Sequence, residues 1–225
     1  MELISFSKSR RCASKRVARP AIEKEGNVFK NWHAMYENVH YSERLLIGNI
    51  MHHEPFVVEI ARLVKPGDKI LEVGSGTGVL AWPLAQAGVL VTSLDNDKEI
   101  LAMAEDNCKL LGANIELVFG DGFEIPFADN SFKLAYSHGL LEHFTDEDIH
   151  RLIKEQLRVA EVVVVGVPLK GCTGAAFGNE RWLTVEEWEN ILGDYAALNA
   201  FGYSEEQMLC VSITRENGSS TGPTV

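Results

Sequence analysis

Residues 70–78 read Ile-Leu-Glu-Val-Gly-Ser-Gly-Thr-Gly, an apolar run that ends in three alternating glycines. The run has the length and composition of a buried strand, and the glycines predict a tight turn directly after it. A glycine turn allows the backbone to approach a ligand at a point where a Cβ atom would clash. We therefore expect a ligand to bind against this turn.

A second apolar run, residues 89–94, is followed at once by Asp95. An acidic residue about 20 positions after a strand and glycine turn can accept hydrogen bonds from both ribose hydroxyls, so the two segments predict a nucleoside site. The dinucleotide fingerprint has its third small residue at the position that Val79 occupies here. The pattern therefore disfavours a pyrophosphate ligand and, with it, a nicotinamide-dependent oxidoreductase.

Strands alternate with helices along most of the chain. Two helices are expected over residues 42–64, and further helices over 79–87, 98–111, 146–158 and from Thr184 as the N-cap. Strands are expected over 69–73, 89–94, 115–119, 132–137 and 160–166, with a closing hairpin over 195–201 and 208–213. This alternation predicts a parallel sheet with helices on both faces and a ligand beyond the carboxyl ends of the strands.

Four motifs occur in a fixed order: Glu72-Val-Gly-Ser-Gly-Thr-Gly, Asp95, Gly120-Asp-Gly and Ser137-His-Gly-Leu-Leu-Glu-His. Over roughly residues 45–215 the chain resembles the class I S-adenosylmethionine-dependent methyltransferases. Within that family it resembles the small-molecule branch, of the methyltransferase type 11 kind. The resemblance implies a Rossmann-like, doubly wound sheet of seven strands with helices on both faces. The sheet is mostly parallel and its last strand is antiparallel.

The resemblance also implies the cofactor S-adenosylmethionine and the residues that hold it. Glu72 and the glycine turn would bind its methionine part, Asp95 its ribose, and Asp121 its adenine amino group. The cofactor-binding set is Glu72, Gly74, Ser75, Gly76, Gly78, Asp95, Asn96, Asp121, Gly122, Phe123 and Ser137. A surface role for Glu72 and a simple turn at Asp121 are the alternatives.

The methyl group is expected near Ser137 and His138, at the end of the fourth strand. A sulfonium is already an activated methyl donor, so the protein must mainly align the acceptor and exclude water. An oxygen or nitrogen acceptor also loses a proton, a task suited to histidine. We favour His143 as the base, with His138 and Glu142 as further catalytic candidates. In the alternative, these side chains only shape the pocket.

Contacts to the acceptor molecule are expected from outside the shared core. The candidates are aromatic and basic side chains in the flanking segments, together with one of the two histidines. They are Trp32, Tyr36, Tyr41, His138, Phe177, Arg181 and Trp182. The same aromatic residues could instead seal an edge of the core.

A metal site is not expected. His52 and His53 are adjacent, so their side chains diverge on a helix, and no ligand follows three or four positions later. The four cysteines form no Cys-x-x-Cys pair, which argues against zinc and a disulfide framework and is typical of a cytoplasmic protein.

Length and charge limit the remaining possibilities. The chain has 225 residues, 46% of them hydrophobic, which suits one α/β domain, and it has no apolar run long enough to span a membrane. The net charge is −11, and residues 1–20 are basic, so the rest is strongly acidic and unsuited to nucleic acid. We expect a monomer or homodimer.

Three regions are expected along the chain. Residues 1–41 would form a partly disordered arm that contributes a cover to the pocket, with an organelle-targeting segment as the alternative. Residues 42–215 would form the methyltransferase domain, and 216–225 a disordered tail. The leading function is methyl transfer from S-adenosylmethionine to oxygen or nitrogen of a small molecule. Carbon methylation and a non-catalytic cofactor-binding protein are the alternatives.

Overall fold

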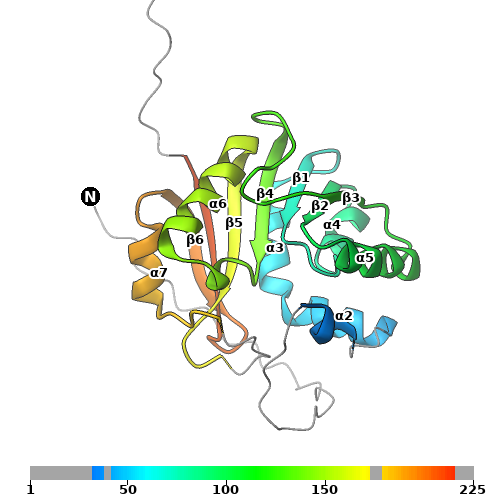
Figure 1. The fold of residues 1–225 in the computed structure, drawn as a ribbon, viewed down its shortest axis with the longest axis horizontal. Coiled ribbons are helices and arrows are strands. Elements are labelled where there is room, and N and C mark those ends of the chain that lie inside the picture. Colours follow the sequence, from blue (N-terminus) through cyan, green and yellow to red (C-terminus); the bar gives the residue numbers. More distant parts are fainter. Residues whose placement is uncertain (1–31, 38–41, 173–178, 216–225) are drawn as a thin grey trace, which may run out of the picture.

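The computed structural model describes residues 32–37, 42–172 and 179–215. Seven strands form one sheet in the order β3-β2-β1-β4-β5-β7-β6 (Figure 1). The strands are β1 (Lys69–Val73), β2 (Leu90–Asp95), β3 (Glu116–Phe119), β4 (Phe132–His138), β5 (Ala160–Pro168), β6 (Ala196–Tyr203) and β7 (Met208–Thr214). The first five strands are parallel, and β7 is antiparallel to both β5 and β6. The predicted sheet is confirmed.

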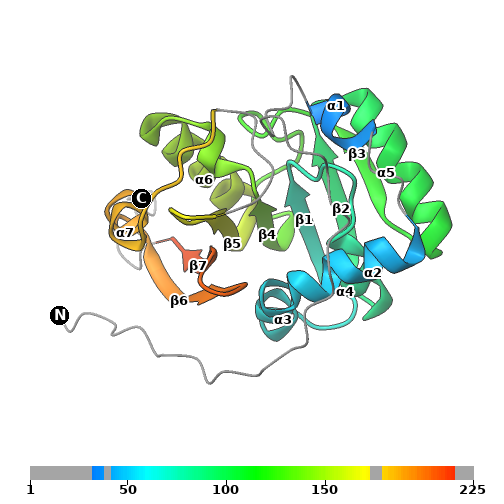
Figure 2. The same cartoon turned by 90° about the horizontal axis from the view of Figure 1, so that it is seen from below.

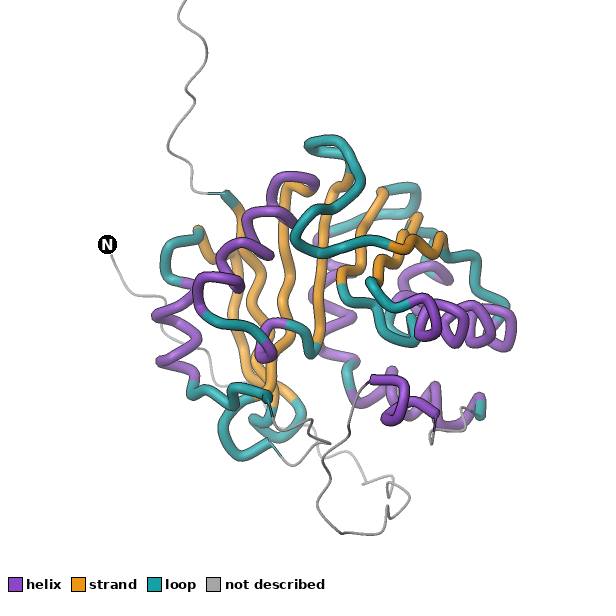
Figure 3. The backbone as a smooth tube through the Cα atoms, in the orientation of Figure 1, coloured by secondary structure: helices purple, strands orange, loops and turns teal. Residues whose placement is uncertain are grey.

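Helices cover both faces of the sheet (Figures 2 and 3). They are α1 (Trp32–Glu37), α2 (Glu43–His52), α3 (Glu54–Leu63), α4 (Ala81–Gln86), α5 (Lys98–Leu111), the short 3-10 helix η1 (Leu141–His143), α6 (Asp146–Val159) and α7 (Val185–Leu192). No helix in the described part of the chain is long and apolar enough to cross a bilayer.

The helix boundaries follow from capping residues. Asp97 accepts hydrogen bonds from the N–H groups of Glu99 and Ile100 at the start of α5, and Gly112 ends that helix in the left-handed conformation. Thr184 and Glu187 form a reciprocal capping box at the start of α7. These helices lie where the sequence predicts them.

Small differences occur where no cap marks the boundary. The helix expected from residue 79 begins at Ala81, which leaves Pro83 in its first turn, where proline costs no hydrogen bond. Strand β4 extends one residue further than predicted, to His138, and β5 extends two residues further, to Pro168. Pairing with neighbouring strands, which the local sequence does not encode, sets these ends.

The core is divided between the two faces of the sheet. On one face α3 and α4 bury side chains such as Phe56, Ile60 and Leu84 against the strands. On the other, α6 and α7 bury Ile153 and Trp188. Burial of these fully enclosed apolar side chains is the main stabilising contribution, at about 1.5–3 kcal/mol for each one.

The sheet topology brings the predicted motifs to one edge. Because β1, β2, β3 and β4 are parallel, the turns that follow them all lie at their carboxyl ends. Strand β6 runs antiparallel to β7 and therefore parallel to β5, so its own end, Tyr203, reaches the same edge. Tyr41, Phe177 and most of the predicted arm and tail lie outside the described residues.

Candidate active site

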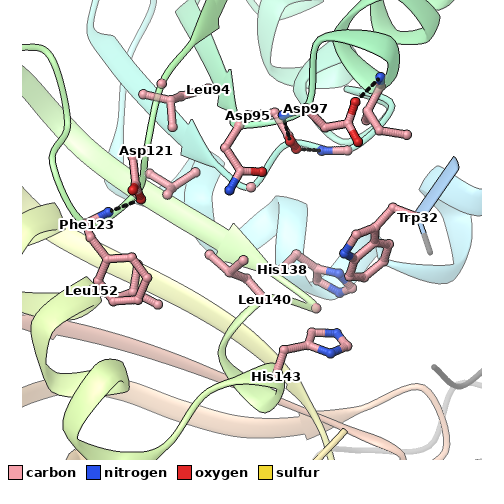
Figure 4. A pocket seen from close by; sticks show the side chains of 18 of the residues that line it. Trp32, Leu94, Asp95, Asp97, Asp121, Phe123, His138, Leu140, His143 and Leu152 are labelled. Carbon is pink, nitrogen blue, oxygen red and sulfur yellow. Dashed lines mark hydrogen bonds between the residues drawn. The ribbon is translucent and has the colours of Figure 1, made fainter. Parts of the chain in front are cut away.

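A cavity opens at the carboxyl ends of the parallel strands (Figure 4). The turns after β1, β2, β3 and β4 contribute to its wall, and α1 contributes from the far side. Its lining residues are Trp32, Tyr36, Val73, Gly74, Gly76, Leu94, Asp95, Asn96, Asp97, Ile100, Gly120, Asp121, Gly122, Phe123, His138, Gly139, Leu140, His143, Phe144 and Leu152. The predicted motifs therefore converge on one cavity.

The glycine turn after β1 requires residues without side chains. Gly74 and Gly76 have φ angles of 67° and 53°, in the left-handed region. A Cβ atom on Gly74 would lie 2.8 Å from Cδ1 of Leu140, and one on Gly76 would lie 2.7 Å from Oη of Tyr36. Helix α1 thus packs directly over the turn.

Asp95 joins the end of β2 to this turn. Its Oδ2 atom accepts a hydrogen bond of 2.8 Å from the N–H of Gly76, and its Oδ1 atom accepts one of 3.0 Å from the N–H of Asp97. Burial raises the pKa of the Asp95 carboxyl, and these backbone donors oppose the increase. The carboxylate is held at the cavity wall, beside Asn96.

The turn after β3 presents Asp121 and Phe123 to the cavity. Oδ1 of Asp121 accepts a hydrogen bond of 2.9 Å from the N–H of Phe123. The Phe123 ring packs edge to face on Phe144, with centroids 5.4 Å apart. A Cβ atom on Gly122 would lie 3.1 Å from both Leu152 and Val73, so the space around this glycine is tight.

Four of the predicted cofactor residues do not line the cavity. Glu72 is buried, Ser93 donates a hydrogen bond of 2.6 Å to its Oε2 atom, and desolvation raises its pKa to about 7. Gly78 donates its N–H to the carbonyl of Ser75 within the turn. The buried hydroxyl oxygens of Ser75 and Ser137 have no hydrogen-bond partner in the described part of the chain.

His138 lines the cavity at the end of β4. Its Nε2 atom lies 2.8 Å from Oη of Tyr203, and its ring packs edge to face on His53 and Phe56, with centroids 4.3 and 4.9 Å away. Burial, with a smaller contribution from His52, lowers the pKa of His138 to about 4. The imidazole is therefore neutral at neutral pH.

His143 lies across the cavity mouth from α1. Its Nδ1 atom is 3.0 Å from Oδ1 of Asn179, and its ring packs edge to face on Trp32 at 5.1 Å. Glu142, whose Oε1 atom is 4.0 Å from Nε2 of His143, is 5% exposed. Burial raises the pKa of Glu142 to about 8, so this acid is protonated at neutral pH.

The predicted acceptor contacts separate into two groups. Trp32 and Tyr36 line the cavity, and Arg181 and Trp182 do not. Arg181 instead holds the segment after η1, because its N–H donates to the carbonyl of Glu142 and its guanidinium donates to the carbonyl of Phe144. Arg181 also forms an ion pair of 2.6 Å with Asp146.

The charged side chains of the cavity wall are all acidic. The lining residues include the carboxylates of Asp95, Asp97 and Asp121 and no lysine or arginine. Such a wall attracts a cation and repels phosphate. A positively charged nucleoside fits the glycine turn, the acidic wall and Asp95 better than a pyrophosphate does.

In the parts of the chain that the structure describes, no three His, Cys, Asp or Glu side chains form a metal-ligand cluster.

Sequence reasoning did not identify Tyr203. It follows no recognisable motif and lies 65 residues from His138 in the chain. Only the position of β6 in the sheet brings the two side chains together. Asp95 and Asp121, by contrast, directly follow predicted strands, so the sequence alone could reveal them.

Comparison with known proteins connects this geometry to a family. Residues 70–161 match the model of the methyltransferase domain. Over 99 residues the chain is 34% identical to demethylmenaquinone methyltransferase of Corynebacterium glutamicum, a match that covers 44% of this chain and 39% of the relative. Over 149 residues it is 29% identical to a sterol 24-C-methyltransferase of Gibberella zeae, covering 61% of this chain and 36% of the relative. The matches thus span less than half the length of either relative.

Solved structures share the fold. A magnesium protoporphyrin IX methyltransferase from Synechocystis, crystallised with S-adenosylmethionine, has a TM-score of 0.63 and 17% identity. The alignment covers 82% of this chain and 89% of that one. The cyclase SpnF has a TM-score of 0.61 and 16% identity, over 73% of this chain and 82% of that one. One fold is thus found in proteins named for different reactions.

Proposed function

Because residues 70–161 form a methyltransferase domain of the class I, S-adenosylmethionine-dependent family, we propose that this chain transfers a methyl group from S-adenosylmethionine to a small molecule. The product of the cofactor would be S-adenosylhomocysteine. When bound, the cofactor supplies a methyl group on a positively charged sulfur, which needs no further activation. The protein then has to bind this cation, orient the acceptor and exclude water.

The observation that carries the proposal is the acidic, glycine-lined wall at the carboxyl ends of β1, β2 and β3. Asp95, Asp121 and Phe123 all line this cavity, and we propose that Asp95 accepts hydrogen bonds from the ribose and that Asp121 and Phe123 contact the adenine. The same wall carries three carboxylates and no lysine or arginine, which favours a cationic ligand over a pyrophosphate. Glu72 is buried, does not line the cavity and hydrogen-bonds to Ser93, so we propose no direct contact between its carboxyl group and the cofactor.

The acceptor would bind beside His138 and His143, under the cover of Trp32 and Tyr36. We propose an oxygen or nitrogen acceptor, with His143 receiving its proton, because both histidines line the cavity and Nε2 of His138 is engaged with Oη of Tyr203. Aromatic rings on several sides favour a flat or apolar molecule and exclude water from it.

A carbon acceptor is the second candidate. The name of the Gibberella relative specifies carbon methylation, and its match covers 61% of this chain. With a carbon acceptor, the two histidines would orient an adjoining polar group of the substrate.

The experiment measures cofactor binding first and turnover second. Calorimetry with S-adenosylmethionine, S-adenosylhomocysteine and NAD should give binding of the first two only. A screen of small acceptors, followed by release of S-adenosylhomocysteine, then detects transfer. Binding of NAD in place of S-adenosylmethionine would overturn the proposal. Binding without turnover of any acceptor would favour the non-catalytic alternative.

A further inference from the structure

The side chain of His138 occupies a slot built by three separate segments of the chain. On one side the ring faces Gly166 of β5, where an added Cβ atom would lie 2.6 Å from Cδ2 of the imidazole. The rings of Phe56 and His53 pack against it from α3 and the α2–α3 junction. The fourth contact is the hydrogen bond between Nε2 and Oη of Tyr203, at 2.8 Å.

The β6–β7 turn, which follows Tyr203, is held in an unusual conformation. Ser204, Glu205 and Glu206 have φ angles of 55°, 59° and 63°, which residues with side chains rarely adopt and hardly ever adopt in succession. The turn is anchored by a bond of 2.8 Å between Oγ of Ser204 and Nε2 of His52, and by the N–H of Leu169, which donates to the carbonyl of Gln207. Such conformations tend to occur where a functional side chain must be placed.

The hydrogen bond between Tyr203 and His138 has a preferred direction. Tyr203 is buried and burial raises its pKa far above the usual value, so it keeps its proton. The hydroxyl proton of a buried tyrosine needs an acceptor, and the nearest one that the structure gives it is Nε2 of His138. Because His138 is neutral, its single ring proton must then reside on Nδ1.

We propose that Tyr203 is a positioning residue that donates a hydrogen bond to Nε2 of His138, a cavity-lining side chain, and so holds the proton of the neutral imidazole on Nδ1. The inference rests on the proposed function and deepens it. Because the Nε2 lone pair accepts the Tyr203 proton, His138 does not serve as the base, which leaves that role to His143.

The test determines the tautomer of His138 by nitrogen-15 NMR, with the protein saturated with S-adenosylhomocysteine. The seven histidines are labelled, and the His138 signals are assigned from a His138→Gln variant. We expect a neutral ring with its proton on Nδ1 in the wild type. Tyr203→Phe, which removes one oxygen atom, should shift the proton to Nε2 or give a mixture of both tautomers.

A matched control exists elsewhere in the chain. Oη of Tyr195 lies 3.1 Å from Nδ1 of His150, a tyrosine–histidine contact of the same kind outside the cavity. Tyr195→Phe should leave the tautomer of His138 unchanged. A second variant, Gly166→Ala, should displace the imidazole and change its signals while the Tyr203 hydroxyl remains present.

Activity gives a second readout once an acceptor is known from the screen. Tyr203→Phe should lower kcat/KM for the acceptor about tenfold, the effect of one lost hydrogen bond, and leave the affinity for S-adenosylhomocysteine unchanged. A wild-type ring protonated on Nε2, or an unchanged tautomer in Tyr203→Phe, overturns the inference. Loss of nucleoside binding by the wild type would instead refute the proposed function, so the two failures are distinguishable.

Discussion

Oδ2 of Asp95 accepts a hydrogen bond of 2.8 Å from the N–H of Gly76, which joins the end of β2 to the glycine turn after β1. The contact fixes the acid at the cavity wall without using all of its acceptor capacity, because a carboxylate has about four lone-pair sites. The same side chain can therefore support the turn and bind a ribose.

Replacement of Asp95 by alanine should weaken cofactor binding. The variant loses the proposed ribose acceptor and the support of the Gly76 N–H, and hydrogen bonds to charged groups contribute about 1.5–3 kcal/mol each. Calorimetry with S-adenosylhomocysteine measures the change. Asp106→Ala, which removes a carboxylate that is 81% exposed on α5, is the control and should bind normally. Unaltered affinity in Asp95→Ala would contradict the assignment.

Replacement of Gly76 by alanine should affect both stability and binding. The left-handed φ angle of 53° costs roughly 1–2 kcal/mol for a residue with a side chain, and the new Cβ atom would also displace Tyr36 and α1. Gly67→Ala is the matched control, since Gly67 has a φ angle of 87° and nothing within 4 Å of an added Cβ atom. Urea unfolding and calorimetry should show a stability loss in both variants and a loss of affinity in Gly76→Ala alone.

Replacement of Glu142 by glutamine should change how stability depends on pH. Burial raises the pKa of Glu142 from 4.5 to about 8, so the folded protein binds this proton more tightly than the unfolded chain does. The wild type should therefore lose stability from this group as the pH rises from about 4.5 to about 8, by up to a few kcal/mol. The neutral amide removes that loss.

Urea unfolding of the Glu142→Gln variant at several pH values measures this effect. The variant should gain stability relative to the wild type as the pH increases through this range. Glu189→Gln, at an exposed position on α7, should show no such trend. A stability difference that stays constant with pH would contradict the buried, protonated state of Glu142.

Replacement of His143 by glutamine should lower the rate of methyl transfer to an oxygen or nitrogen acceptor by about 10²–10⁴-fold, the usual contribution of a general base. Affinity for S-adenosylhomocysteine should be retained, because the proposed nucleoside contacts are made by other residues. His150→Gln, outside the cavity, is the control. A rate equal to that of the wild type would remove His143 as the base and leave it a role in shaping the pocket.

The sequence predicted the elements that carry local signals. Helix α5 matches its predicted range because Asp97 and Gly112 cap it, and α7 follows the capping box at Thr184. The alternation of strands and helices predicted a parallel sheet with the motifs at one edge, and the family resemblance implied its seven strands and the antiparallel one. For the two helices the determining contacts lie within a few residues of one another.

The rest depends on contacts between distant segments. The burial of Glu142, the position of Glu72 behind the cavity wall and the contact of Tyr203 with His138 each require side chains from separate elements. Arg181 was predicted to contact the acceptor, and in the structure it contacts the carbonyls of Glu142 and Phe144 and the carboxylate of Asp146. The composition of the chain and the spacing of its motifs do not predict contacts between such distant residues.

Tyr203 lies near the end of the chain and is therefore synthesised well after the turns that would hold the nucleoside. The turns that would hold the nucleoside are complete once residue 123 has left the ribosome, whereas Tyr203 is added some eighty residues later. A polypeptide released early, before the final hairpin, would retain every motif that identifies the family and yet lack the phenol that orients His138. The sequence of a truncated copy would still identify the family, although the proposed positioning of His138 beside the methyl acceptor had been lost.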